Sequence, residues 1–193
     1  MSGNNQGNAP LVFLDLETTG LRPGIEPWHD RVCEIAALRF DPTGETDRLV
    51  TLINPQRPIP AEAAAIHHIS DDMVQTAPCF GDIIPMINRV VDGGTLVIHN
   101  APFDLGFLRA EFRRFGLEWI ERPVVDTLVI ARRQIPTVSH SLPNLATLLG
   151  VSPGGHRALG DVLTMKAVFE RLRLGEVQNA RGPIPRRSSS YQP

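Results

Sequence analysis

The sequence predicts an α/β fold in which a mixed sheet of about five strands carries helices on both faces. Short, strongly apolar runs of the kind found in buried strands occur at 11–16, 95–99 and 124–126. Two longer strand-like runs follow the first of these, and segments of helical periodicity alternate with the later ones. With 193 residues, 42% of them hydrophobic, the chain can bury one sizeable core, so one domain is expected.

The first half of the chain is predicted to begin as a meander of three strands. Leu11–Leu16 is nearly all apolar, and the loop sequence that follows it, TTGLRPGIEPWHD, is rich in glycine and proline. Arg31–Phe40 and Asp47–Ile53 have the composition of two further strands. The turn sequence DPTG at 41–44 lies between them, so they are expected to pair as an antiparallel hairpin.

Helices are predicted in most of the remaining chain. Phe80, Ile83, Ile87 and Val91 are spaced as on one face of a helix. Pro85 lies inside this segment, and we expect the regular helix to begin nearer to it because proline removes a backbone donor. The other predicted helices are Ala61–His68, a short one capped by Ser70, Phe103–Phe115, 127–134, Ser141–Leu149 and Ala158–Leu174.

The two ends of the chain differ in composition from the predicted domain at 10–174. Residues 1–9 are polar, and residues 175–193 are poor in apolar side chains, so both are expected to be disordered. Neither a secretory signal nor a membrane-spanning apolar run is apparent, which predicts a soluble, cytoplasmic protein without a membrane partner. Cys33 and Cys79 lie far apart outside any metal-binding pattern and are expected to be reduced thiols.

The charge balance bears on the possible ligands. A formal net charge of −2 argues weakly against a strongly basic nucleic-acid-binding protein. Two bound divalent cations would change this net charge to +2, so the balance does not exclude a metal-dependent nucleic-acid enzyme.

Asp15 and Glu17 are the first candidates for catalytic chemistry. They are two residues apart in a predicted strand, where alternate side chains point to the same face, so both carboxylates face one side of the sheet. Leu14 and Leu16 then point to the opposite side, into a core. Two acids on a buried strand repel each other and lose solvation, and a divalent cation would neutralise them.

Asp104, His156 and Asp161 extend this acidic set. Asp104 follows the predicted strand at 95–99, and the ends of neighbouring strands form the crevice in which α/β sheets bind ligands. Asp161 lies early in the last helix, where the positive end of the helix dipole favours a carboxylate. His156 follows Gly154 and Gly155, which predicts a loop that can bring a neutral imidazole to the site as a general base.

Three segments in this order, DLETTG, HNAPFD and HRALGD, resemble the motifs of the DEDDh-type 3′–5′ exonuclease family. The chain is similar in this respect to the proofreading epsilon subunit of bacterial DNA polymerase III. The stretches AIHHIS, VVDTLVIARR and SHSLPNLATLLGV also fit, so the resemblance covers roughly residues 10–174. His68 departs from the pattern, because the family commonly has glycine after the histidine equivalent to His67. No long C-terminal extension of the kind that attaches epsilon to its polymerase follows 174.

The resemblance implies a ribonuclease H-like fold and removal of nucleotides from a 3′ end by a two-metal mechanism, with release of nucleoside 5′-monophosphates. The implied cofactors are two Mg²⁺ or Mn²⁺ ions, and the implied partner is a nucleic-acid 3′ end, expected to be single-stranded. Association with a DNA polymerase is a further implication, as are proofreading and DNA repair. The metal ligands would be Asp15, Glu17, Asp104 and Asp161, the catalytic residues His156 and Glu17, and the substrate-binding residues Thr18, Leu21, His67 and Phe103.

Two alternatives to this function remain open at the level of the sequence. One is a non-catalytic module that binds nucleic acid or a polymerase, although no metal ligand has been lost. The other is a hydrolase of short oligoribonucleotides, which a series of substrate lengths would distinguish. The choice between DNA and RNA depends on contacts to the 2′-hydroxyl that a sequence does not locate.

Overall fold

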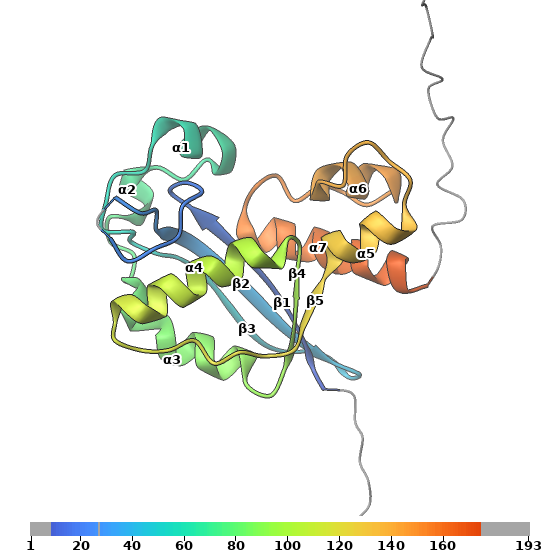
Figure 1. Ribbon diagram of the computed structural model, residues 1–193, viewed down its shortest axis with the longest axis horizontal. Coiled ribbons are helices and arrows are strands. Elements are labelled where there is room, and N and C mark those ends of the chain that lie inside the picture. The colour runs from blue at the N-terminus through green and yellow to red at the C-terminus, as the bar shows by residue number, and fades with distance from the viewer. Residues whose placement is uncertain (1–8, 27, 175–193) are drawn as a thin grey trace, which may run out of the picture.

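A five-stranded mixed sheet forms the centre of the protein, as shown by a computed structural model that describes residues 9–26 and 28–174 (Figure 1). The predicted N-terminal arm, apart from residue 9, and the predicted tail at 175–193 lie outside these residues. The strand order is β3-β2-β1-β4-β5. The strands are β1 (Leu11–Thr18), β2 (Val32–Asp41), β3 (Gly44–Leu52), β4 (Thr95–Ile98) and β5 (Val124–Asp126).

The central strand β1 pairs with neighbours of opposite direction on its two sides. It runs antiparallel to β2, where Glu17 lies opposite Glu34, and parallel to β4. The parallel strands β1, β4 and β5 therefore end at the same edge of the sheet. This is the edge at which α/β sheets commonly bind ligands.

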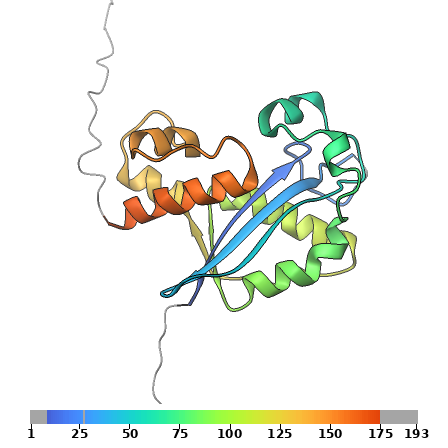
Figure 2. The same ribbon diagram turned by 180° about the vertical axis from the view of Figure 1, so that it is seen from behind.

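Helices cover both faces of the sheet (Figures 1 and 2). On one face, α3 and α4 pack against the side of β1 that carries Leu14 and Leu16. On the other face, α5, α6 and α7 pack against the side that carries Phe13. The helices are α1 (Ala61–His67), α2 (Asp71–Val74), α3 (Phe80–Val91), α4 (Ala101–Arg114), α5 (Thr127–Gln134), α6 (Leu142–Leu148) and α7 (Ala158–Arg173).

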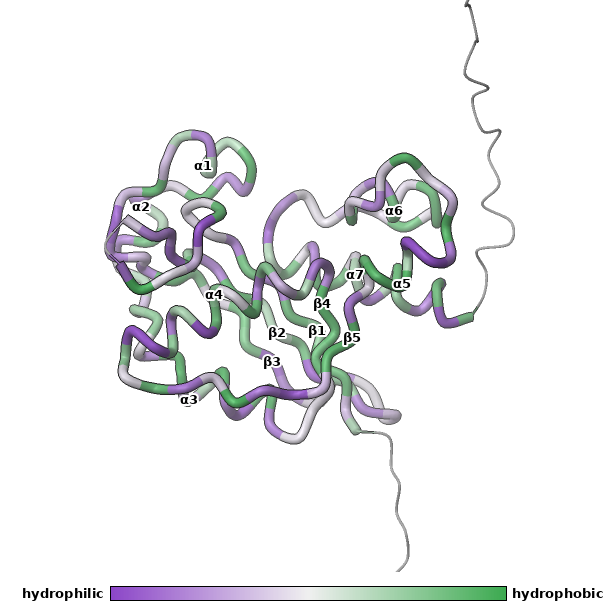
Figure 3. The backbone as a smooth tube through the Cα atoms, viewed as in Figure 1, coloured by the Kyte–Doolittle hydropathy of each residue, from purple (hydrophilic) through white to green (hydrophobic). Residues whose placement is uncertain are grey.

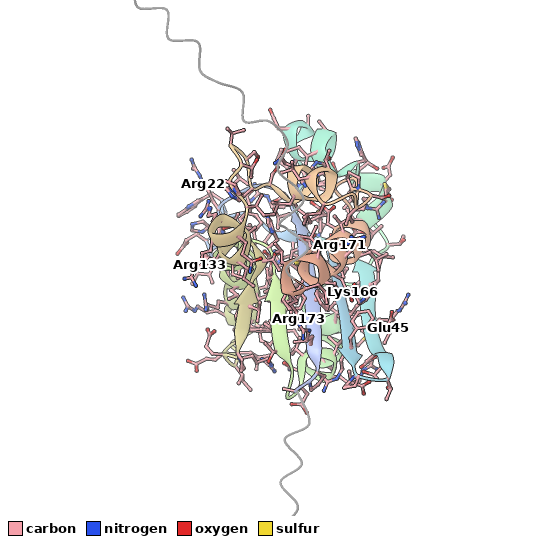
Figure 4. The ribbon with its side chains drawn as sticks, turned by 90° about the vertical axis from the view of Figure 1, so that its right-hand side faces the viewer. Arg22, Glu45, Arg133, Lys166, Arg171 and Arg173 are labelled. Atoms are coloured by element: carbon pink, nitrogen blue, oxygen red, sulfur yellow. The ribbon has the colours of Figure 1, made fainter. Side chains whose placement is uncertain are left out.

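Hydrophobic residues concentrate in the sheet, and charged residues lie on the outer surface with a few buried exceptions, among them Glu34, Asp104 and Glu111. The tube in Figure 3 is strongly hydrophobic at β4, a strand that is covered on two faces. Figure 4 looks onto the α7 side, where Lys166, Arg171 and Arg173 lie on the helix in front of the sheet. Among the described residues, no helix has both the length and the apolarity needed to cross a bilayer.

The prediction that α3 begins near Pro85 is wrong, because the helix starts at Phe80 with the proline inside it. The structure shows two features that stabilise this early start. The backbone N–H of Cys79 donates to Asp82 in a capping box (2.9 Å), and the apolar face that includes Phe80 and Ile83 is buried. Proline at this depth removes one backbone hydrogen bond, which the cap and the buried face offset.

Other boundaries move by a few residues. The strand β3 begins at Gly44 and not at 47, because the hairpin ladder continues to the Asp41–Gly44 pair. The helix α4 begins at Ala101 and not at 103, which places Asp104 in its first turn.

His68 ends α1 in the left-handed conformation (φ 59°), where a glycine would cause no strain. The departure at this position therefore has a conformational cost, on the order of 1–2 kcal/mol.

Candidate active site

The carboxylates of Asp15, Glu17 and Asp161 converge at the ligand-binding edge of the sheet. Side chains alternate along β1, so Asp15 and Glu17 point to the same face as Phe13, toward the layer that contains α7. Asp161 lies in the first turn of α7 and meets them from that layer. One ligand oxygen from each of the three lies within 4.8 Å of the others.

Asp104 approaches the same cluster from the opposite layer. It is 3% exposed and lies in the first turn of α4, directly beyond the end of β4. Among the neighbouring charges, Asp104 is the one that most strongly raises the pKa of Asp15. Burial raises the pKa of Asp104 itself, and hydrogen bonds from the backbone of Asp104 and Leu16 partly oppose this rise. All four predicted metal ligands are thus neighbours in space, although Asp104 is not part of the closest group of three.

Burial and mutual repulsion make these acids reluctant to ionise in the metal-free protein. Loss of solvation is the largest cause that raises the pKa of Asp15 well above its usual value, and the nearby acids add to the rise. Burial, followed by the charges of Asp161 and Glu34, raises the pKa of Glu17 to about 8. Burial also raises the pKa of Asp104 and that of Asp161.

This donor set fits a hard divalent cation. Mg²⁺ and Mn²⁺ prefer oxygen ligands, and carboxylates that repel one another gain most from such a charge. Arg157 is the cation that lowers the pKa of Glu17. Its guanidinium hydrogen-bonds to Glu34 and not to the candidate metal ligands. The cluster could therefore hold metal ions without rearrangement of an internal ion pair.

His156 lies on an exposed loop immediately before α7. Its φ of 55° and that of Gly155 (77°) are both in the left-handed region. The preceding Gly154 packs so closely on the helix that an added Cβ would lie 2.2 Å from Asp161 Oδ1. Burial raises the pKa of Asp161, and the nearby His156 and its backbone hydrogen bond partly oppose this rise, so the exposed His156 is a neighbour of the acidic cluster.

The four predicted substrate-binding residues line one pocket. Thr18, Leu21, His67 and Phe103 border a cavity of about 420 Å³ that also includes Glu17. The His67 ring is fixed by a hydrogen bond from the Ile69 backbone N–H to Nδ1 (3.0 Å), and burial lowers its pKa. A neutral, oriented imidazole beside a half-buried aromatic ring suits an uncharged base or sugar more than a phosphate.

Two further acids support the site and were not singled out by the sequence reasoning. Asp126 accepts hydrogen bonds from the backbone of Ala101 and Leu128, and so holds the first turns of α4 and α5 in place. Glu34 binds Arg157 at the start of α7. Glu34 interrupts the apolar run of β2, and Asp126 ends the apolar strand β5, and these positions are the signal that could have identified them.

The family model of the RNase_T exonucleases matches residues 12–169. The epsilon subunit of DNA polymerase III from Treponema pallidum is 38% identical over 163 residues, which are 82% of this chain and 74% of the relative. An epsilon-like protein from Rhodobacter capsulatus is 38% identical over 180 residues (89% and 24%). A PolC-type DNA polymerase III from Thermotoga petrophila is 33% identical over 189 residues (92% and 14%). The chain thus spans a quarter or less of these last two relatives.

Solved structures show the same fold. Exonuclease X in complex with 5′ overhanging duplex DNA has a TM-score of 0.63 and 30% identity, with 89% of this chain and 93% of that chain covered. An exonuclease I structure has a TM-score of 0.74 at 21% identity (87% and 42%), which supports the fold alone. These similarities confirm the predicted ribonuclease H-like fold and the predicted exonuclease class. The chain therefore belongs to the RNase_T exonuclease family.

Proposed function

We propose that the chain is a metal-dependent 3′–5′ exonuclease that hydrolyses terminal phosphodiester bonds of nucleic acid and releases nucleoside 5′-monophosphates. The observation that carries this proposal is the convergence of Asp15, Glu17 and Asp161 within 4.8 Å, with the buried Asp104 beside them. Such a buried group of acids has little stabilising value in itself. It suits a site whose cations bind the phosphate of a substrate.

Asp15, Glu17, Asp104 and Asp161 would hold two Mg²⁺ or Mn²⁺ ions, with Asp15 central to the group. When bound, these ions would stabilise the attacking and leaving oxygens of an in-line displacement. His156 would accept the proton of the attacking water, because it lies exposed next to the first turn of α7 that carries Asp161, and imidazole is the most common general base in enzymes. A loop position gives this base room to approach a bound substrate.

The pocket lined by Thr18, Leu21, His67 and Phe103 would receive the terminal nucleotide. Phe103 offers a ring on which a base can stack, a contact that tolerates any sequence. Single-stranded 3′ ends suit such a pocket, because an unpaired base presents its faces. The duplex with a 5′ overhang in the exonuclease X structure makes a recessed 3′ end the second substrate to test. Association with a DNA polymerase is supported by the epsilon and PolC-type relatives.

The test is digestion of oligonucleotides labelled at the 5′ end, with matched DNA and RNA in a series of lengths and with Mg²⁺ or Mn²⁺. A ladder that shortens one nucleotide at a time from the 3′ end is expected for the wild type, with loss of nearly all activity in Asp15→Ala. Equal rates for wild type and Asp15→Ala would refute the proposal. Rates that peak at two to five nucleotides would instead identify a hydrolase of short oligonucleotides, and metal-dependent affinity without turnover would identify a binding module.

A further inference from the structure

Glu34 is a buried acid next to the candidate metal site that the proposed reaction does not use. It lies in β2 directly opposite Glu17 of β1, and it is 3% exposed. The residues around it in β2 are apolar and fully buried, so a carboxylate here loses nearly all of its solvation. A buried charge in such a place is tolerated only if it is paired and hydrogen-bonded.

Within the described part of the chain, the hydrogen-bond partners of the Glu34 carboxylate all come from the start of α7. Arg157 Nε lies 3.0 Å from Oε2, and Arg157 Nη2 lies 2.5 Å from Oε1. The backbone N–H of Ala158 donates to Oε2 at 2.9 Å. The carboxylate thus binds a guanidinium fork and the first helical N–H together, an arrangement with strong geometric specificity.

The same contacts connect Glu34 to Asp161. Arg157 occupies the N-cap position of α7, and its side chain does not accept a capping hydrogen bond from the helix backbone. Glu34 takes over this capping role from a neighbouring strand, since it satisfies one of the N–H groups that a helix leaves free at its start. The backbone N–H of Asp161 then donates to Arg157 O at 2.9 Å, in the first turn of the same helix.

Glu34 is therefore joined to two of the candidate ligands by short, rigid routes. One route is the β1–β2 ladder to Glu17, and the other is the first turn of α7 to Asp161. Movement of α7 along the sheet would break the guanidinium fork and the cap at once. The loop that carries His156 leads directly into Arg157, so the pair also lies at the end of this loop.

We propose that Glu34 and Arg157 form a positioning pair that sets the separation of Glu17 and Asp161 and gives the His156 loop a fixed end. The pair touches neither the substrate nor the reacting atoms. It acts through the two ligands, as outer residues commonly do in metal sites. This inference depends on the metal site proposed above and adds residues to it.

The chain offers a matched control in a second buried pair. Glu111 of α4 is bound by Arg31 through the same two-pronged geometry, with distances of 2.7 and 3.0 Å. Its Oε1 also accepts the backbone N–H of Val32, at 3.4 Å. The Glu111 side chain is 1% exposed, against 5% for Glu34, so both carboxylates are equally deprived of solvent. Glu111, Arg31 and Val32 do not line the predicted nucleotide pocket, and Glu111 is not part of the group of candidate metal ligands.

The experiment measures the Mn²⁺ dissociation constant of the full chain by calorimetry without nucleic acid, the steady-state constants on an oligonucleotide, and the midpoint of thermal unfolding. Glu34→Gln and Arg157→Gln should weaken Mn²⁺ binding and lower kcat by about 10- to 100-fold, with KM changed by less than about threefold. Arg157→Lys should recover only part of the loss, because lysine keeps the charge without the fork. Glu111→Gln should lower the unfolding midpoint, while Mn²⁺ affinity and kcat stay within about twofold of wild type.

Wild-type Mn²⁺ affinity and kcat in both Glu34→Gln and Arg157→Gln would overturn the inference. So would an equal loss of Mn²⁺ affinity in Glu111→Gln, which would reduce the effect to general stability. If Glu34→Gln does not fold, the Arg157 variants decide, because the Arg157 side chain is 41% exposed. Failure of the metal site itself has a separate signature, namely Mn²⁺ binding that survives Asp15→Ala.

Discussion

Replacement of Asp15 by asparagine should stabilise the metal-free protein while it abolishes activity. Asp15 is the candidate ligand whose ionisation is opposed by burial and by Asp104, Glu17 and Asp161 together. Asparagine has nearly the same shape and carries no charge. The variant therefore removes the electrostatic cost of the site and keeps the packing of the strand.

The geometry gives the size of the effect. At an effective dielectric constant of about 20, two unit charges no more than 4.8 Å apart repel by about 3.5 kcal/mol or more. Protonation limits the cost: while pH lies between the unfolded and the raised folded pKa of a carboxyl, each pH unit destabilises the fold by up to about 1.4 kcal/mol. Because the pKa of Asp15 is raised, its ionisation cost is absent below about pH 4 and grows as pH increases.

The assay is thermal unfolding of wild type and Asp15→Asn in a chelator at pH 4.5 and pH 8. At pH 8 the variant should be more stable by about 2–3 kcal/mol, which for a chain of this size raises the midpoint by about 5–10 °C. At pH 4.5 the two midpoints should nearly coincide. Mg²⁺ at about 1,000 times its dissociation constant should reverse the order at pH 8, since it stabilises by about 4.1 kcal/mol and only the wild type would bind it.

Two results would refute this reasoning. One is a variant that is less stable than wild type in chelator at pH 8, which would mean that the Asp15 carboxylate contributes favourable contacts. The other is an equal stabilisation of both proteins by Mg²⁺, which would place the ion elsewhere. A control variant, Asp92→Asn at the exposed end of α3, should show neither the pH-dependent gain nor the reversal.

Three further predictions test neighbouring parts of the site. His156→Ala should lower kcat at neutral pH by about 100-fold or more, with partial recovery at high pH where hydroxide replaces the base, as followed by oligonucleotide digestion. Gly154→Ala should weaken Mn²⁺ binding in calorimetry, because its Cβ would lie 2.2 Å from Asp161 Oδ1, whereas Gly93→Ala, with no atom within 4 Å, should not. Burial raises the pKa of Cys33 to about 12, so alkylation at pH 8 followed by mass spectrometry should label Cys79 and leave Cys33 unmodified until the chain unfolds.

The sequence predicted the core of the site because the relevant rules are local. Strand alternation alone places Asp15 and Glu17 on one face, and the structure shows both facing α7. The early position of Asp161 in α7 follows equally from helix periodicity and a glycine-rich loop before it. The order of the three motifs supplied the rest, since it matches a known family.

The supporting residues depend on contacts between distant segments, which periodicity does not encode. Nothing in the local sequence links Glu34 to Arg157, 123 residues later, and yet that contact anchors α7. The early start of α3 was missed for a related reason. Local rules count the hydrogen bond lost at Pro85, and they do not count the burial of the helix against the sheet.

The site divides into a rigid part and an adjustable part, and the division follows from where each residue sits. Asp15 and Glu17 belong to the central strand, Asp161 is tied to β2 through Glu34, and Asp104 lies in a first turn held by Asp126. Because each of these acids is fixed by the sheet or by a capped helix, their repulsion cannot be relieved by movement and is relieved by cations or protons. His156, the proposed general base, stands instead on an exposed loop, where its side chain has room to adjust to a substrate.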